Sequence, residues 1–200
     1  GSHMGIKNDL EIRLQKLQQQ GNFKNYLEQY PTDASTAAYF LIEIYNDGNI
    51  GGRSVIDAGT GNGILACGSY LLGAESVTAF DIDPDAIETA KRNCGGVNFM
   101  VADVSEISGK YDTWIMNPPF GSVVKHSDRA FIDKAFETSM WIYSIGNAKA
   151  RDFLRREFSA RGDVFREEKV YITVPRIYRH HSYDRARIEA VIFGVRNHSF

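Results

Sequence analysis

The amino-acid sequence predicts an α/β fold: one seven-stranded, mostly parallel sheet with helices on both faces and an antiparallel hairpin at its end. Two observations predict it. Between residues 54 and 160, strand-like apolar segments mostly alternate with helical segments, which is typical of a parallel sheet. The last two strand-like segments, 167–175 and 187–195, are joined by a short stretch without a helix. Such a connection is too short for a parallel crossover and indicates a hairpin.

The individual helices are predicted from apolar spacing and from residues that begin or end helices. Apolar residues recur at helical spacing near the N-terminus, and Gly21 is expected to end that helix. Thr32 or Asp33 can cap the second helix, and Pro84 suits a first turn. Helices are expected at 6–20, 32–46, 63–73, 84–94, 128–139 and 148–160, and strands at 54–59, 76–83, 97–103, 111–117, 140–146, 167–175 and 187–195.

Length and composition favour one intracellular domain. The 200 residues can bury a substantial core. We expect residues 1–3 to be a tag remnant and residues 4–200 to form a single domain, with a helical extension over about 4–50. No apolar run approaches the roughly 18 residues of a membrane helix. Cys67 and Cys94 lack metal-site spacing, so the sequence predicts no metal site and a reduced, cytoplasmic protein.

Charge is unevenly distributed, although the net charge is only −2. Residues 1–148 carry 11 basic and 18 acidic side chains, whereas residues 149–200 carry 12 basic and 7 acidic ones. The basic C-terminal quarter is a weak indication of a polyanionic partner. A solvated charged surface explains the same distribution equally well.

A glycine-rich turn, "DAGTGNG", follows the first predicted strand. Glycines permit a tight turn and let a ligand approach the backbone, and the next helix offers unpaired N–H groups. Asp57, Gly59, Gly61 and Gly63 are therefore candidate cofactor-binding residues. The spacing lacks the third glycine of the dinucleotide fingerprint, so S-adenosyl-L-methionine fits better than a dinucleotide. A turn with only a structural role is the alternative.

Two more aspartates stand where the second and third strands are expected to end. Asp81 follows Gly61 by 20 residues and can accept hydrogen bonds from ribose hydroxyls. Ile82 can pack on an adenine face, and Asp103 can accept from the adenine amino group. Each aspartate alone could be a helix cap or a turn residue. Carboxylates at three neighbouring strand ends together predict a ligand-binding rim.

The fourth predicted strand ends in Asn117-Pro118-Pro119-Phe120, the candidate catalytic residues. In this kind of sheet the fourth strand lies beside the first, so Asn117 is expected next to the glycine turn. The carbonyls of the Asn117 side chain and of the Pro118 backbone can accept the two hydrogens of a base amino group. Phe120 can stack on the base. Transfer then relies on orientation and polar contacts without a strong general base; a plain strand-terminating turn is the alternative.

Several segments in the same order and spacing resemble a known family. "LEQYPT", "DAGTGNGIL", "FDIDPDAIE", "IMNPPFG", "DRAFIDKAF" and "VPRIYRHH" are similar to segments of the archaeal and eukaryotic small-subunit ribosomal RNA adenine-N6 methyltransferases. The resemblance implies a Rossmann-like class I methyltransferase fold, S-adenosyl-L-methionine as cofactor and an adenine of structured RNA as substrate. The Asn-Pro-Pro-Phe motif also occurs in DNA adenine, guanine-N2 and glutamine-N5 enzymes, so it identifies only the class, whereas "LEQYPT" is more specific.

The resemblance also implies roles for single residues. Gln29 and Thr32 match a segment that closes over the cofactor, and Tyr178 and His181 match a pattern near the RNA-binding face. The loop between the last two strands is expected to contact RNA phosphates through a basic cluster that includes Arg185 and Arg187. Its candidate RNA-binding residues are Arg176, Tyr178, Arg179, His180 and His181. A basic loop that binds nothing is the alternative. Thr60 and Asn62 depart from the family, in which cysteines are common at these positions.

A protein partner is implied as well. Several family members work with a small zinc-containing activator protein. The third strand is expected at a sheet edge, and residues 97–102 contain no lysine or proline to guard it. We expect the activator or a second copy of the chain to add a strand along 97–102. A neighbouring loop that covers this edge is the alternative.

The sequence thus predicts an S-adenosylmethionine-dependent RNA adenine-N6 methyltransferase. Guanine-N2 methylation of RNA and glutamine-N5 methylation of protein are alternative reactions, although glutamine enzymes usually carry tyrosine at the position of Phe120. A non-catalytic RNA-binding scaffold that kept the fold is the alternative from another class. An NAD-type dehydrogenase is disfavoured by the glycine spacing.

Overall fold

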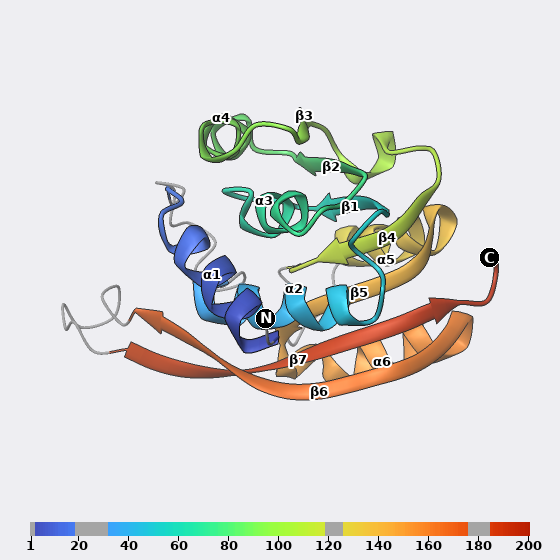
Figure 1. The fold of residues 1–200 in the computed structure, drawn as a ribbon. Helices are drawn as coiled ribbons and strands as arrows, with labels where there is room; N and C mark the ends of the chain where they lie inside the picture. Colours follow the sequence, from blue (N-terminus) through green and yellow to red (C-terminus); the bar gives the residue numbers. More distant parts are fainter. Residues whose placement is uncertain (1–2, 19–31, 119–125, 176–184) are drawn as a thin grey trace.

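The computed structural model describes residues 3–18, 32–118, 126–175 and 185–200 (Figure 1). Its strands are β1 (Ser54–Ala58), β2 (Ser76–Asp81), β3 (Asn98–Val101), β4 (Tyr111–Met116), β5 (Ser139–Asn147), β6 (Gly162–Pro175) and β7 (Arg185–Asn197). They form one seven-stranded sheet of order β3-β2-β1-β4-β5-β7-β6. β1 to β5 are mutually parallel, and β7 runs antiparallel to both β5 and β6. The predicted terminal hairpin is therefore confirmed.

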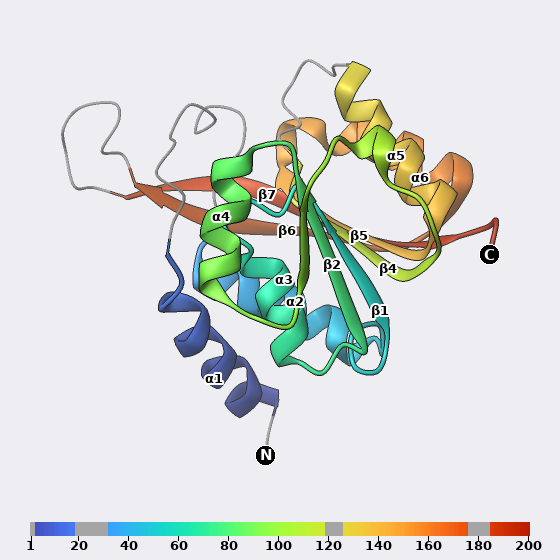
Figure 2. The same cartoon turned by 90° about the horizontal axis from the view of Figure 1, so that it is seen from above.

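Helices cover both faces of the sheet. They are α1 (His3–Gln15), α2 (Ala34–Asn46), α3 (Ile64–Leu71), α4 (Pro84–Asn93), α5 (His126–Thr138) and α6 (Arg151–Arg161), with the short 3₁₀ helices η1 (Val104–Glu106) and η2 (Ala148–Ala150). α1 to α4 pack on one face, and η1, α5 and α6 pack on the other (Figure 2). Because both faces are covered, most residues of the central strands are buried, as expected for a parallel sheet.

One expected helix boundary is wrong, and one expected helix cap is confirmed. The first helix ends at Gln15 and not near Gly21, so apolar spacing overestimated its length. The N-cap of α2 is Asp33, whose carboxylate accepts a hydrogen bond from the Thr36 N–H at 2.8 Å. Thr32, the other candidate cap, makes a different contact, which is described below.

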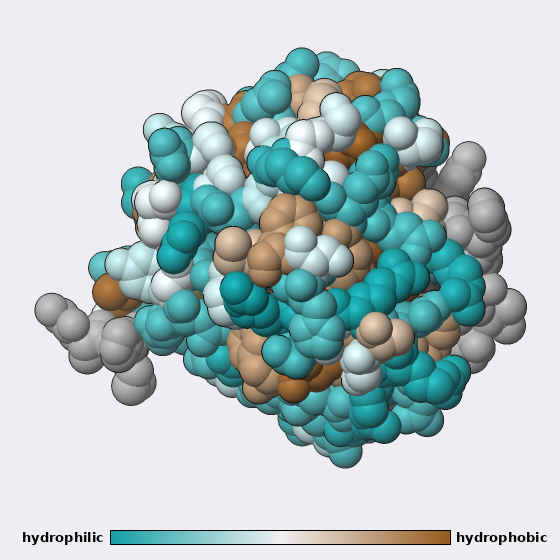
Figure 3. All heavy atoms as spheres, turned by 90° about the vertical axis from the view of Figure 1, so that its right-hand side faces the viewer, coloured by the Kyte–Doolittle hydropathy of each residue, from teal (hydrophilic) through white to brown (hydrophobic). Residues whose placement is uncertain are grey.

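Each face of the sheet has its own apolar core. Trp114 of β4 and Phe80 of β2 are fully buried on the α5 side, where their rings meet edge to face. Tyr143 of β5 lies in the core under α2 and donates a hydrogen bond to Asp47. At the edge where the parallel strands begin, the surface is mostly hydrophilic with smaller apolar areas (Figure 3). The candidate site belongs to the opposite, carboxyl edge.

Cys67 of α3 and Cys94, which follows α4, form a disulfide. This finding overturns the expectation of reduced thiols. The two cysteines are 27 residues apart in sequence, but the packing of α3 against α4 brings their Cα atoms to 5.9 Å. Spacing along the chain gave no indication of that approach. Within the described ranges, no helix is long and apolar enough to cross a membrane.

Candidate active site

The glycine loop, residues 59–63, connects β1 to α3 at the carboxyl edge of the sheet. Gly59, Gly61 and Gly63 have φ angles of 73°, 56° and 87°, in the left-handed region that favours glycine. A Cβ at Gly63 would meet Ala90 at 3.0 Å, so the loop is packed tightly against α4 there. A Cβ at Gly61 would meet nothing within 4 Å. The loop therefore has open space beside Gly61.

Asp57 supports the glycine loop from below. Its side chain is only 1% exposed and accepts hydrogen bonds from the Thr60 hydroxyl at 2.7 Å and from the Ala66 N–H. Burial raises the pKa of Asp57 to about 7, against the lowering effect of these hydrogen bonds. The sequence predicted that Asp57 binds the cofactor. The structure instead buries its side chain beneath the glycine loop, where it contacts Thr60 and Ala66.

Asp81 ends β2 and is hydrogen-bonded to the same loop. Its carboxylate accepts from the Gly61 N–H at 2.9 Å and from the Asp83 N–H at 3.0 Å. Burial raises the pKa of Asp81 above its ordinary value. Ile82, the next residue, is 69% exposed, which is unusual for a large apolar side chain. A half-buried carboxylate beside an exposed apolar side chain suits a ligand with a hydroxyl-bearing part and a flat apolar part.

Asp103 follows β3 and caps η1. Its side chain accepts from the Ser105 N–H at 2.9 Å, and the Glu106 side chain accepts from the Asp103 N–H at 2.8 Å. The Ser105 N–H holds the pKa of the exposed Asp103 below its ordinary value. The capping role considered from the sequence is therefore present, at a position on the same rim as Asp81.

Asn117 follows β4, next to the glycine loop. β4 pairs with β1, and Met116 lies opposite Ala58, which confirms the expected adjacency of these strands. The Asn117 Nδ2 donates to the Thr32 hydroxyl at 2.7 Å, and Thr32 is 4% exposed. Pro118 is buried, and its carbonyl oxygen lies near Gly146 of β5. Thr32 thus comes from the N-terminal segment to orient the amide of Asn117.

The remaining predicted site residues lie outside the described residues. These are Gln29, Pro119, Phe120, Arg176, Tyr178, Arg179, His180 and His181.

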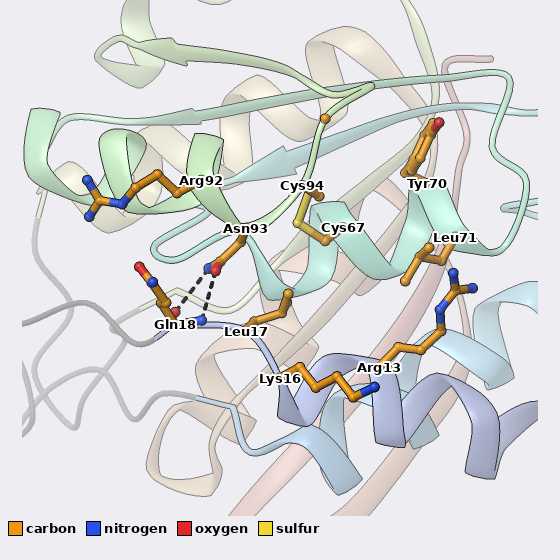
Figure 4. A pocket seen from close by; sticks show the side chains of 11 residues that line it. Arg13, Lys16, Leu17, Gln18, Cys67, Tyr70, Leu71, Arg92, Asn93 and Cys94 are labelled. Atoms are coloured by element: carbon orange, nitrogen blue, oxygen red, sulfur yellow. Dashed lines mark hydrogen bonds between the residues drawn. A yellow bond between two sulfur atoms is a disulfide. The ribbon is translucent and has the colours of Figure 1, made fainter.

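Two asparagines that sequence reasoning did not select join the glycine loop to α1 and α4. Asn93 donates to the backbone oxygen of Asn62 at 2.8 Å. It also donates to the Gln18 oxygen at 3.0 Å and accepts from the Gln18 N–H at 2.7 Å (Figure 4). Asn62 donates to the Gln18 oxygen at 2.9 Å. A pocket of about 420 Å³ opens beside this network and is lined in part by the disulfide (Figure 4). No motif marks such long-range amide contacts, so the sequence offered no signal for them.

Comparison with known proteins gives the following similarities. The family described as ribosomal protein L11 methyltransferase (PrmA) matches residues 35–111. The rRNA N(6)-adenosine-methyltransferase Mettl5 of Drosophila melanogaster is 33% identical over 184 residues, which cover 83% of this chain and 84% of the relative. The PrmA match stops before Asn117, whereas the Mettl5 similarity extends over most of both chains.

Two solved structures are similar over nearly their full length. A Thermoplasma acidophilum protein is 93% identical with a TM-score of 0.87, covering 98% of this chain and 100% of that one. A candidate RNA methyltransferase of Pyrococcus horikoshii is 36% identical with a TM-score of 0.85, covering 96% and 97%. The sheet order and terminal hairpin are those of class I S-adenosylmethionine-dependent methyltransferases, which confirms the predicted fold class.

Proposed function

This chain belongs to the RNA methyltransferase family that includes the Mettl5 proteins, and on that basis we propose that it methylates the N6 amino group of an adenine in structured RNA. The proposed substrate is small-subunit ribosomal RNA, and the methyl donor is S-adenosyl-L-methionine. The observation that carries the proposal is Asn117, which follows β4 beside the glycine loop and has its amide oriented by Thr32.

The described rim fits this cofactor. Gly61 leaves open space at the loop, Asp81 presents a carboxylate beside it, and Ile82 exposes an apolar surface. We assign Asp81 to the ribose hydroxyls and Ile82 to the adenine face. Asp103 at the next strand end is assigned to the adenine amino group. When bound, S-adenosyl-L-methionine supplies an electrophilic methyl group on a positively charged sulfur.

The role of Asn117 follows from the chemistry of its amide. Nδ2 donates to the Thr32 hydroxyl, which orients the side chain, and an amide oxygen is the kind of acceptor that an amino group of the substrate needs. We assign this oxygen and the Pro118 carbonyl to the two hydrogens of the target amine. Two acceptors hold the amine nitrogen in position, and their contacts strengthen as the nitrogen becomes tetrahedral. The proton lost from the amine passes to water, and Phe120 is assigned to stack on the base.

Protein methylation is the second candidate, because the PrmA family matches residues 35–111. That stretch runs from α2 to the start of β4 and includes the glycine loop, Asp81 and Asp103. It ends before Asn117, so the similarity supports the cofactor-binding part of the site. It carries no information on the molecule that accepts the methyl group. Mettl5 similarity over most of the chain favours RNA.

A labelled-methyl assay tests the proposed function. The purified protein is incubated with methyl-labelled S-adenosyl-L-methionine and total RNA, and the RNA is digested to nucleosides. We expect label in N6-methyladenosine, with Asn117→Ala as the inactive control. Label in N2-methylguanosine would contradict the assigned base, and label in ribosomal protein instead of RNA would favour the second candidate. A scaffold would bind RNA and transfer nothing.

We also propose partners for two surfaces outside this chemistry. The basic residues at 176–181 stand between β6 and β7 in the sequence, and they are assigned to RNA phosphates. β3 is an edge of the sheet, and Val101 on it is 51% exposed. We assign this edge to a small zinc-containing activator protein that adds a strand to it.

A further inference from the structure

The β6–β7 hairpin extends beyond the rest of the sheet. β5 ends at Asn147, which is paired with Ala190 of β7, but β6 and β7 remain paired out to Pro175 and Arg185. Residues 171–175 and 185–189 therefore form a two-stranded ribbon that projects from the carboxyl edge (Figure 1). This is the edge at which β4 ends and Asn117 lies. A nucleic acid bound at Asn117 would have the ribbon as a neighbour.

One face of the ribbon is anchored to the protein and the other is open. Val170, Ile172 and Ile188 pack into the core under α1 and α2. Since side chains alternate along a strand, Tyr171 and its cross-strand neighbour Glu189 lie on the other face.

The helix on that other face covers only the inner part of β6. α6 contacts β6 through Glu167, which accepts hydrogen bonds from Arg151 and Arg155 at 2.7 Å. These arginines, Arg155 foremost, lower the pKa of Glu167 to about 2. Arg151 is the first residue of α6, so Lys169 and Tyr171 lie farther along the strand, beyond the helix.

The open face carries an aromatic and basic pair. The Arg187 guanidinium lies over the Tyr171 ring at 4.6 Å from its centroid, and Tyr171 is 49% exposed. Lys169 pairs with Glu189 at 3.5 Å, with both side chains about half exposed. Exposed aromatic rings and guanidinium planes are the surfaces on which unpaired RNA bases stack. The contact between Tyr171 and Arg187 also stabilises the hairpin. A contact between two strands does not, however, require that half of the tyrosine side chain stay exposed at this edge.

We propose that Tyr171 and Arg187 form a base-stacking platform for an unpaired RNA nucleotide near the target adenine, with Lys169 beside its phosphate. The inference rests on the proposed function, because it assumes that the substrate is RNA. It adds a recognition surface on the β6–β7 ribbon, separate from the residues assigned to the chemistry.

The test compares RNA binding by tyrosine and arginine variants. The probe is a short fluorescein-labelled single-stranded RNA with one adenine among pyrimidines, and anisotropy reports binding. Tyr171→Ala should weaken binding roughly tenfold, whereas Tyr171→Phe keeps the ring and should stay within about twofold. Arg187→Gln removes half of the platform and should weaken binding. Lys169→Gln removes the charge assigned to the phosphate and should reduce the salt dependence by about one unit of slope. Cofactor affinity, measured by calorimetry, should not change.

Tyr70→Ala is the matched control, because Tyr70 on α3 is 47% exposed but lies elsewhere on the molecule. Melting curves establish that each variant is folded. The platform is ruled out if the wild type does not bind the RNA, if Tyr171→Ala binds like Tyr70→Ala, or if Tyr171→Phe is as weak as Tyr171→Ala. A wild type that binds RNA through Tyr171 but transfers no methyl contradicts the proposed function and leaves the platform standing.

Discussion

Asn117 is assigned to the substrate amine, and a hydrogen bond to Thr32 holds its side chain in place. Its Nδ2 is held by the Thr32 hydroxyl, so truncation removes the acceptor but leaves the rim of Gly61, Asp81 and Ile82 in place. We expect Asn117→Ala to lower turnover on RNA by roughly 100-fold or more, with cofactor affinity nearly unchanged. Thr32→Val, which removes only the orienting hydroxyl, should have a smaller effect. Near-wild-type turnover of Asn117→Ala at saturating RNA would refute its catalytic role.

Asp81 makes a structural contact with the glycine loop and has a proposed role in cofactor binding. Its carboxylate holds the Gly61 N–H, and it is assigned to the ribose hydroxyls of the cofactor. Asp81→Ala should weaken cofactor binding by on the order of 1–3 kcal/mol and also lower the melting temperature. Asp81→Asn keeps one acceptor and should lose less of both. Calorimetry that finds the same cofactor dissociation constant for wild type and Asp81→Ala would remove Asp81 from the site.

We expect Asp57 to make a pH-dependent contribution to stability. Burial raises its folded-state pKa to about 7 from an ordinary value of 3.8, so the folded protein binds this proton more tightly than the unfolded chain. The unfolding free energy should therefore fall as pH rises between these two values, by about 1.4 kcal/mol for each unit of pKa difference.

Asp57→Asn tests this assignment, because the amide keeps an acceptor for Thr60 and cannot ionise. The stability of the variant relative to wild type should increase as pH rises from about 4 to about 7 and then level off. Denaturant titrations across that interval measure the difference. Parallel pH profiles for the two proteins would mean that Asp57 does not titrate in this range.

At the scale of elements, the structure shows which residue of the exposed β3 edge can test the proposed docking. Phe99 packs toward α4 and Met100 packs on the opposite core, so a substitution at either position would disturb packing as well as the edge. The Ala102 N–H bonds inward to Asp81, and because N–H directions alternate, the Val101 N–H points outward. For the same reason Asn98 faces β2, and a proline there would break the sheet itself.

Val101→Pro removes an outward donor at a side chain that is 51% exposed. We expect it to abolish association with a co-expressed activator, or self-association measured by sedimentation, while Val101→Ala leaves association intact. Equal association of the two variants would show that the edge is not the docking site.

At the scale of the whole molecule, the disulfide links α3 to the end of α4 across 27 residues. Closing a loop of that size restricts the unfolded chain, so reducing Cys67–Cys94 should lower the unfolding free energy by about 3 kcal/mol. Denaturation of the protein with and without dithiothreitol measures the effect. The double variant Cys67→Ser/Cys94→Ser has no disulfide to reduce, so its unfolding free energy should be the same with and without dithiothreitol. Two titratable thiols in the unreduced, denatured protein would contradict the bond.

The sequence by itself determined the order of the elements, the parallel sheet with its terminal hairpin, and the strand ends that carry Asp57, Asp81 and Asn117. These features are readable because periodicity, glycine spacing and strand termini are local properties of the chain. The rim was also predictable, since parallel strands place their carboxyl ends at one edge.

Only the tertiary structure decided which of these groups meet. It buried Asp57 beneath the loop, paired Thr32 with Asn117 across 85 residues, joined Asn93 to Asn62, and brought Cys67 to Cys94. Such contacts depend on how helices pack on the sheet, and a hydrogen bond or disulfide between distant residues leaves no periodic pattern in the chain. The open face of the β6–β7 ribbon has the same origin, because it exists only where α6 begins short of Tyr171.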